Sequence, residues 1–139
     1  MQLDPATLLI VSAATTLLVG ALFLATWRQA PESRSLAFWG AAHFVGAVGS
    51  AGLALRGQIP DLVSIGVANA IVLAAYGLIW SGVRSFEGLN PRVGWAMAGA
   101  LVWCALCFVP AFYDSIVLRI LYASAVATLY CGAATVEIW

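Results

Sequence analysis

Charged residues are scarce in this chain, and their scarcity excludes several classes of protein. Asp, Glu, Lys and Arg together make up 9% of the 139 residues, whereas soluble domains average about 25%. A soluble core of this length needs a polar surface, and the side chains for that surface are missing. Lysine is absent and the arginines form no cluster. The chain therefore lacks the means to neutralise a row of phosphates, and we expect no binding to nucleic acid.

The motifs of catalysis and metal binding are also missing. The sequence has one histidine and contains no nucleophile beside a base, no paired carboxylates, no phosphate-binding loop and no cluster of metal ligands. We therefore expect no enzyme activity, no catalytic residue, no metal and no cofactor. Cys104, Cys107 and Cys131 lie in apolar segments and make no disulfide framework. With no basic group nearby in sequence, the C-x-x-C spacing of the first two indicates small packing residues.

Apolar residues are what the chain has in quantity, at 63% of the sequence and a mean hydropathy of +0.99. They form five runs, which are Ala6 to Trp27, Ser35 to Leu55, Leu62 to Val83, Val93 to Phe112 and Ile116 to Ile138. A transmembrane helix needs roughly 20 mostly apolar residues, and every run reaches that length. We predict an all-α, multi-pass membrane protein in which residues 1–139 form one bundle of five transmembrane helices. Because the breaks between runs are short, consecutive helices should be antiparallel neighbours.

The arginines and tryptophans predict the orientation of this bundle. Cytoplasmic loops carry an excess of positive charge, and two alternate breaks hold Arg28, Arg34, Arg84 and Arg92. The opposite side holds Arg56 and Arg119, so we expect the N-terminus outside and the C-terminus in the cytoplasm. Tryptophans prefer the membrane interface, and the ones expected at the cytoplasmic ends of helices are Trp27, Trp39, Trp80, Trp95 and Trp139. Trp103 alone falls within a run.

Small residues at a spacing of four predict where helices pack, because they allow two backbones to approach closely in lipid. The second run carries Ala42, Gly46, Ser50 and Ala54, and the fifth carries Ala123, Ala127, Cys131 and Thr135. We interpret both stripes as ordinary contacts within the bundle. The alternative is a dedicated interface with a second copy of the chain or with a larger membrane complex.

A few polar residues lie where lipid would penalise them, and these are the candidate ligand-binding residues. His43 is either a neutral imidazole bonded to a neighbouring helix or a ligand, metal or proton site. Asn69 is either an interhelical hydrogen-bonding residue or part of a binding site. Charged residues expected to gather at the outer face are Arg56, Asp61, Asp114 and Arg119, with Asp4. They either bind a small polar or charged ligand or are solvated interface charges.

Two stretches carry a resemblance to a known family. The segment from Ala54 to Asn69 reads ALRGQIPDLVSIGVAN, and the segment from Trp80 to Gly88 reads WSGVRSFEG. With the opening at Leu3 and the closing Glu137-Ile-Trp, they resemble the membrane-embedded N-terminal sensory region of bacterial diguanylate cyclases. In that family further helices and a cytoplasmic GGDEF domain follow, which makes cyclic di-GMP. Because the GGDEF motif is absent here, the resemblance implies no catalytic residue.

The resemblance implies a sensory or anchoring domain of a signalling protein in the bacterial inner membrane, cut before an output domain. A small accessory subunit of a larger membrane complex is the first alternative. Part of a secondary transporter is the second, and it is weaker because transporters use broken helices or charges within their spans. Besides the lipid bilayer, the expected partners are a second copy of the chain or other membrane subunits.

Overall fold

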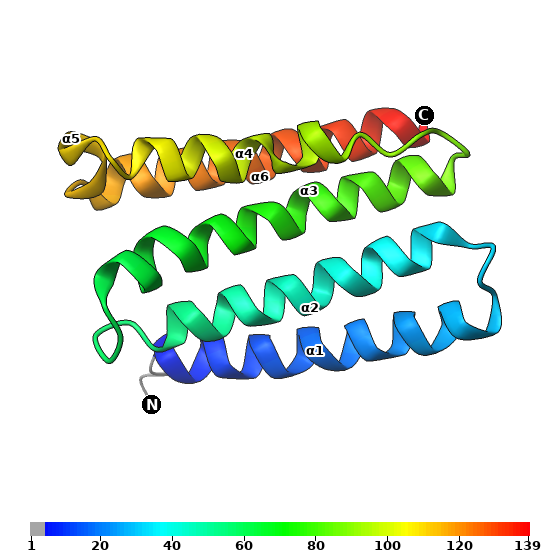
Figure 1. Ribbon diagram of the computed structural model, residues 1–139, viewed down its shortest axis with the longest axis horizontal. Helices are drawn as coiled ribbons and strands as arrows, with labels where there is room; N and C mark the ends of the chain where they lie inside the picture. The colour runs from blue at the N-terminus through cyan, green and yellow to red at the C-terminus, as the bar shows by residue number, and fades with distance from the viewer. Residues whose placement is uncertain (1–4) are drawn as a thin grey trace.

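The computed structural model describes residues 5–139, and the regular structure in that part of the chain is helical. The elements are α1 (Pro5–Gln29), α2 (Arg34–Ala54), the π-helical η1 (Leu62–Val67), α3 (Ala68–Phe86), α4 (Val93–Leu106), α5 (Pro110–Tyr113) and α6 (Ile116–Ile138). Consecutive long helices run in opposite directions, so the described chain begins and ends at opposite ends of an elongated bundle (Figure 1).

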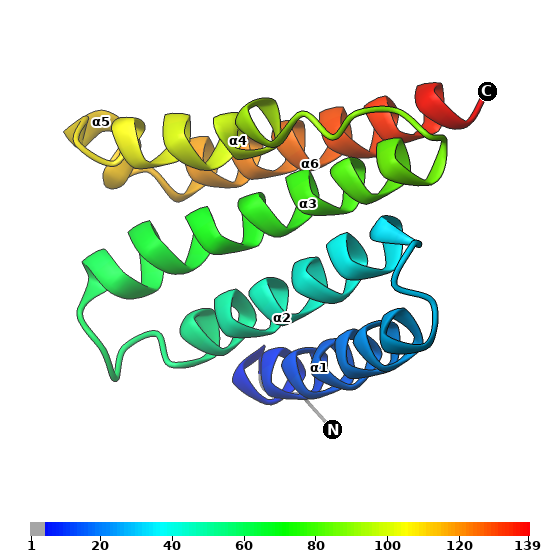
Figure 2. The ribbon, with the colours of Figure 1, turned by 45° about the vertical axis from the view of Figure 1, so that its right-hand side comes forward.

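Helix α3 is the centre of this bundle. It packs against α2 on one side and against α4 and α6 on the other, while α1 packs on α2 at the outside of the layer (Figures 1 and 2). Its contact with α4 is close because Gly77 has no side chain. A Cβ atom at Gly77 would lie 1.9 Å from the carbonyl oxygen of Ala96, so any larger residue forces the two helices apart.

Four of the described helices are long and apolar enough to cross a membrane, namely Thr7–Gln29, Arg34–Ala54, Leu62–Phe86 and Ile116–Ile138. They match four of the five predicted runs. The all-helical class and these four apolar spans are therefore confirmed. Helix α1 extends two residues beyond its run, and the third span continues through Arg84 to Phe86. The first residue of each run falls within two residues of the observed helix start.

The prediction of one continuous helix from Val93 to Phe112 is wrong. Helix α4 ends at Leu106, and the chain turns before α5 begins at Pro110. The reason lies at Val109, whose φ of −96° and ψ of 112° are extended. The ring of a proline disfavours helical backbone at the residue before it. Pro110 therefore does more than end the run, because it forces the turn and then occupies the first turn of α5.

The buried core lies between α3, α4, α5 and the first half of α6. Its apolar centre consists of Leu73, Ala100, Trp103 and Phe112. Trp103 is 1% exposed and meets the ring of Phe112 edge to face, with the ring centroids 5.3 Å apart. This aromatic contact fixes the turn after α4 against the bundle.

The two predicted packing stripes differ in how far the bundle covers them. On α2, Ala42 and Ala54 are buried, while Gly46 and Ser50 are half-buried. On α6, Ala123 and Ala127 are half-buried and the next two positions, Cys131 and Thr135, are exposed. The second half of the α6 stripe thus faces outward.

Candidate functional site

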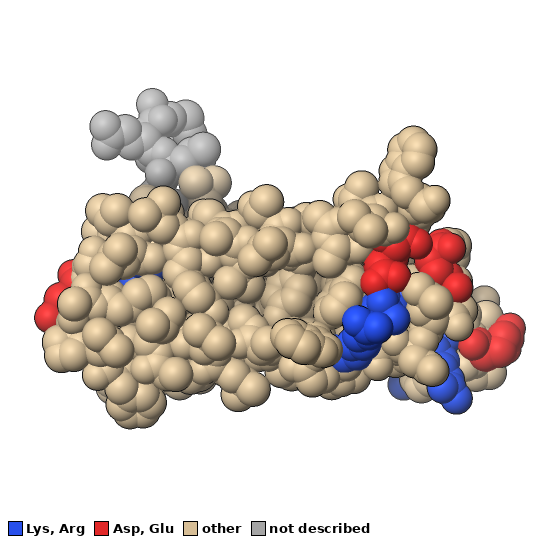
Figure 3. Space-filling view, turned by 90° about the horizontal axis from the view of Figure 1, so that it is seen from above, with Lys and Arg blue, Asp and Glu red and all other residues tan. Residues whose placement is uncertain are grey.

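Polar chemistry is concentrated at the two ends of the bundle. In the space-filling view of one face, charged side chains gather at the ends and the long middle is free of them (Figure 3). The antiparallel arrangement brings the breaks with Arg28, Arg34, Arg84 and Arg92 to the same end as the last turn of α6. Arg56 and Arg119 lie at the other end.

A cavity of about 200 Å³ lies at that second end, where α2 stops and α6 begins. Arg56 from the turn after α2, Asn69 from the first turn of α3 and Arg119 from the first turn of α6 line it. The indole of Trp103 also lines it, and the remaining walls are aliphatic. We call it the Arg56–Arg119 pocket. The fold thus brings together three of the residues that the sequence marked as candidates.

The π-helical turn η1 positions Asn69 in this pocket. The Asn69 Nδ2 atom donates a hydrogen bond to the carbonyl oxygen of Ile65 at 2.7 Å, so the amide bonds within its own helical segment and not to another helix. Trp103 Nε1 donates to the carbonyl oxygen of Gly66 at 3.0 Å. A π turn interrupts the α-helical bonding pattern and is frequent at functional sites. Here the side chains of Asn69 and Trp103 donate to two carbonyls of the π turn itself, those of Ile65 and Gly66.

The acidic residues predicted at this end do not line the pocket. Asp61 is the N-cap residue of η1 and its side chain makes no capping hydrogen bond. Asp114 follows α5 and is exposed. Asp4 lies outside the described residues. Arg119 Nε makes a long hydrogen bond of 3.4 Å to the carbonyl oxygen of Ser115, and within residues 5–139 neither Arg56 nor Arg119 forms an ion pair.

His43 lies apart from the Arg56–Arg119 pocket, on the face of α2 that meets α1. Its imidazole stacks on the ring of Phe23, with centroids 5.4 Å apart and planes 5° from parallel. Beside it is a cavity of about 210 Å³ between α1, α2 and α3, lined also by Thr16 and Tyr76. No set of three or more His, Cys, Asp or Glu residues in the described chain is placed to hold a metal ion. The geometry makes His43 a packing partner of α1.

The ion pair between Arg84 and Glu137 was not predicted from the sequence. Arg84 Nη1 contacts Glu137 Oε1, and the two side chains are only 10% and 19% exposed. The residues occupy the last turns of α3 and α6 and lie 53 positions apart in the chain, so no spacing motif could connect them. In the sequence, Arg84 is an orienting charge and lies in the Trp80–Gly88 segment that carries the resemblance. One signal was available. Arg84 and Glu137 are charged residues within the ends of apolar helices, where a charge is costly unless it is paired.

Arg84 also organises the turn that follows α3. Its Nε donates to the carbonyl oxygen of Asn90 at 3.0 Å, and its guanidinium lies over the Trp80 ring, 5.7 Å from the centroid. That ring in turn packs near Tyr130 of α6, with centroids 6.1 Å apart. The last turns of α3 and α6 are therefore joined by charge, hydrogen bonding and aromatic packing.

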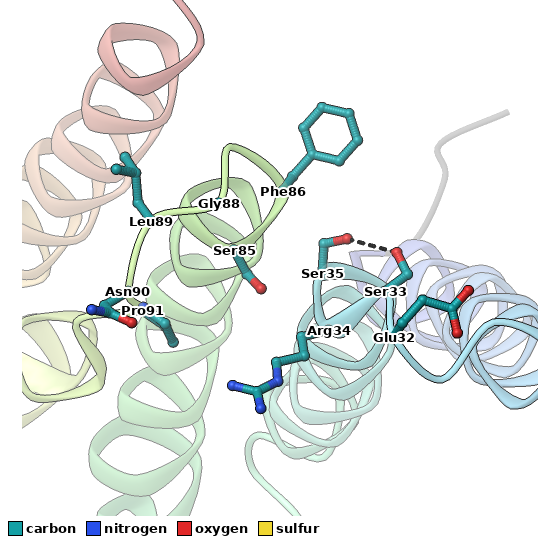
Figure 4. A pocket seen from close by; sticks show the side chains of 10 residues that line it. All are labelled: Glu32, Ser33, Arg34, Ser35, Ser85, Phe86, Gly88, Leu89, Asn90 and Pro91. Atoms are coloured by element: carbon teal, nitrogen blue, oxygen red, sulfur yellow. Dashed lines mark hydrogen bonds between the residues drawn. The ribbon is translucent and has the colours of Figure 1, made fainter.

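A cavity of about 500 Å³ lies beside this turn at the same end of the bundle. Figure 4 shows Arg34 reaching from the first turn of α2 towards Asn90 and Pro91, while the ring of Phe86 points away. A hydrogen bond of 3.3 Å joins the hydroxyls of Ser33 and Ser35 at its edge. The cavity separates the α1–α2 turn from the α3–α4 turn.

The cysteine pair and two of the tryptophans are placed differently from the sequence-based interpretation. Cys104 is exposed and Cys107 half-buried, so neither is a fully buried packing residue. Trp80 is buried. Trp39 Nε1 donates to the carbonyl oxygen of Ile79 at 3.3 Å. These two indoles hold helices together inside the bundle.

No protein-family model, no curated protein and no solved structure matches this chain.

Proposed function

We propose that this chain is the sensory and anchoring domain of a bacterial signalling protein in the inner membrane. In this proposal it crosses the bilayer five times, its N-terminus lies outside and its C-terminus in the cytoplasm. Helix α6 then carries a signal from the outer end of the bundle to an output domain after Trp139. The resemblance to the input region of diguanylate cyclases suggests that output.

The fifth crossing depends on α4. Its 14 residues rise about 21 Å at 1.5 Å each, which is less than the roughly 30 Å of a hydrocarbon core. The turn after Leu106 and α5 lengthen this segment, and Trp103 and Phe112 pack both parts onto the bundle. We infer that α4 and α5 together complete the crossing, although Phe108 and Val109 in the turn between them are exposed.

The observation that carries the sensory proposal is the buried Arg84–Glu137 pair. It links the last turn of α6 to the central helix at the end where four of the six arginines lie. Placing two charges out of water is costly, and this pair sits where α6 would leave the membrane. The pair therefore couples α6 to the central helix at the point where a signal would pass to the segment after Trp139.

A chimera tests this proposal. A cytoplasmic enzyme that is active only as a dimer is fused after Trp139, and its activity is compared between wild type, Glu137→Gln and Arg92→Gln. Arg92 is exposed and is the matched control. We expect Glu137→Gln to change the enzyme activity per molecule of membrane-inserted protein, with no change for Arg92→Gln. Equal activity in all three proteins would argue against signal transfer through α6.

A second candidate function is an accessory subunit of a membrane complex, favoured by the outward-facing part of the α6 stripe. Cys131 and Thr135 are exposed, and a Cβ atom at Gly132 would meet nothing within 4 Å. Purification in a mild detergent separates the two candidates. A partner retained in fixed ratio would favour the subunit. A stop codon directly after Trp139 in the natural gene would count against an output domain.

A further inference from the structure

We propose that the Arg56–Arg119 pocket binds a small oxyanion, that is, a carboxylate or phosphate group. This inference deepens the proposed sensory function and rests on it only for the side of the membrane that the pocket faces. The ligand class follows from three properties of the pocket, which are its charge, its donors and its size.

The described residues give the pocket a positive charge. Arg56 and Arg119 share one cavity, and no acidic residue within residues 5–139 lines it. Like charges that line one cavity repel each other, most strongly where part of the wall is aliphatic. The ion pair of the described chain lies at the other end of the bundle, between Arg84 and Glu137. A bound anion would supply the missing negative charge for Arg56 and Arg119.

The donors of the pocket suit an oxygen-bearing anion. Guanidinium groups present parallel N–H donors that match two oxygens of a carboxylate or phosphate. Within residues 5–139, the guanidinium group of Arg119 makes one hydrogen bond, a long one from Nε to a backbone carbonyl, so its terminal donors are available there. The pocket also lies at the N-terminal end of α6, a 23-residue helix, whose macrodipole favours negative charge there.

The pocket is built by other interactions before any ligand enters. Asn69 and Trp103 are held by their hydrogen bonds to the π turn, and Ser115 caps α6 by accepting a hydrogen bond from the backbone N–H of Leu118. The walls therefore do not have to order when an anion binds, which lowers the entropic cost of binding. Of the two arginines, Arg56 is exposed and Arg119 is half-buried.

The volume of the pocket suits a small anionic group. About 200 Å³ corresponds to roughly six or seven water molecules at about 30 Å³ each, and drug-sized ligands occupy about 300 Å³ or more. Inorganic phosphate or a short carboxylate fits this space. So does the phosphate of an anionic lipid, whose chains would follow the aliphatic wall of Ile116 and Ile120. The shared chemistry is one anionic oxygen group.

Binding is measured on the whole chain in dodecyl maltoside, a detergent without phosphate. Inorganic phosphate is titrated at constant ionic strength and followed by calorimetry, and phosphatidylglycerol is then added and its retention counted by native mass spectrometry. The variants are Arg56→Gln and Arg119→Gln, with Arg92→Gln as the control at the opposite end. Losing one charge-assisted hydrogen bond should weaken binding about tenfold or more.

Each outcome decides the proposal. Saturable phosphate binding that both pocket variants weaken, and Arg92→Gln does not, supports a soluble anion. Retention of phosphatidylglycerol that is lost in the same two variants supports the same site with a lipid headgroup. No binding in either arm, or equal binding in pocket and control variants, overturns the site.

Two further controls keep the test sharp. Where Arg119→Gln lacks the helix content of the wild type, Arg119→Lys replaces it, and its single ammonium group should weaken binding severalfold because it cannot form two parallel bonds. Binding in detergent does not depend on orientation. Failure to bind therefore overturns the pocket and leaves the proposed function standing, whereas a reversed topology in cells overturns the proposed function and leaves the pocket intact.

Discussion

Replacing Arg84 should destabilise the bundle more than replacing its partner Glu137. Arg84 makes three interactions, namely the ion pair with Glu137, a hydrogen bond to the Asn90 carbonyl and a cation–π contact with Trp80. Glu137 makes only the first. The two residues therefore provide an internal comparison between losing a charge partner and losing a whole cluster.

The magnitudes follow from burial. The Glu137 side chain is 19% exposed, and leaving a buried charge without its partner costs about 3 to 5 kcal/mol. We expect Arg84→Leu to fall in that range, because it also removes a cation–π contact of about 0.5 to 1 kcal/mol. Glu137→Gln should cost about 1 to 3 kcal/mol, since Arg84 keeps its hydrogen bond to the Asn90 carbonyl and its contact with the Trp80 ring.

Unfolding in mixed micelles, driven by increasing SDS and followed by circular dichroism, measures these free energies. The double variant Arg84→Leu/Glu137→Leu completes a double-mutant cycle. It should be no less stable than Arg84→Leu because it leaves no buried charge unpaired. Arg92→Gln, at an exposed position, should change the free energy of unfolding by less than about 0.5 kcal/mol. If the destabilisation of the double variant equalled the sum of the two single variants, Arg84 and Glu137 would not interact and the assigned energies would be refuted.

Three further predictions concern packing and use the same unfolding assay. Gly77→Ala should cost about 2 kcal/mol because its Cβ would clash with Ala96. The control Gly132→Ala, with open space around it, should be neutral or stabilise by up to about 1 kcal/mol. Equal effects of the two substitutions would exclude a tight α3–α4 contact. Tyr130→Phe should cost about 1 kcal/mol, because the phenol oxygen lies 3.1 Å from the Gly99 amide and 2.8 Å from the Ala96 carbonyl oxygen, and an unchanged midpoint would contradict these bonds. Trp103→Phe should cost about 1 to 3 kcal/mol by leaving the Gly66 carbonyl without its donor, and a variant as stable as wild type would show that the π turn does not need the indole.

The long helices were predictable because hydropathy alone determines them. Four runs became helices with nearly the predicted bounds, since lipid requires each backbone polar group to be bonded within its own segment. The run from Val93 to Phe112 failed because hydropathy does not register Pro110. Its effect on Val109 is a local steric one, and the residue before a proline was the signal that would have located the break.

The candidate site was predictable only in part. Because consecutive helices alternate in direction, the number of predicted helices places Arg56 and Arg119 at the same end of the bundle. Which charges then meet depends on side-chain direction, so the acids expected beside them, Asp61 and Asp114, do not line the pocket. Asn69 was marked as polar within a span, but its bond to Ile65 depends on the π turn, which the sequence pattern does not reveal.

Tryptophan and arginine each had two roles that composition does not separate. Trp95 and Trp139 are exposed as an interfacial residue would be, whereas Trp39 and Trp80 pack inside the bundle. In the same way, Arg84 serves both as an orienting charge and as half of a buried pair. Position at a helix end was common to all of these residues, and only the tertiary contacts distinguish them.

The side of the membrane on which Asp114 and Trp139 lie tests the central proposal most directly. Alkaline phosphatase, active only outside, and green fluorescent protein, fluorescent only in the cytoplasm, are fused in turn after Asn90, Asp114 and Trp139 in bacterial cells. Five crossings predict fluorescence after Asn90 and Trp139 and phosphatase activity after Asp114. Fluorescence after both Asn90 and Asp114, with phosphatase activity after Trp139, would show that α4 does not cross, and phosphatase activity after Asn90 would show the reverse orientation. Either result would contradict the proposed path of the signal.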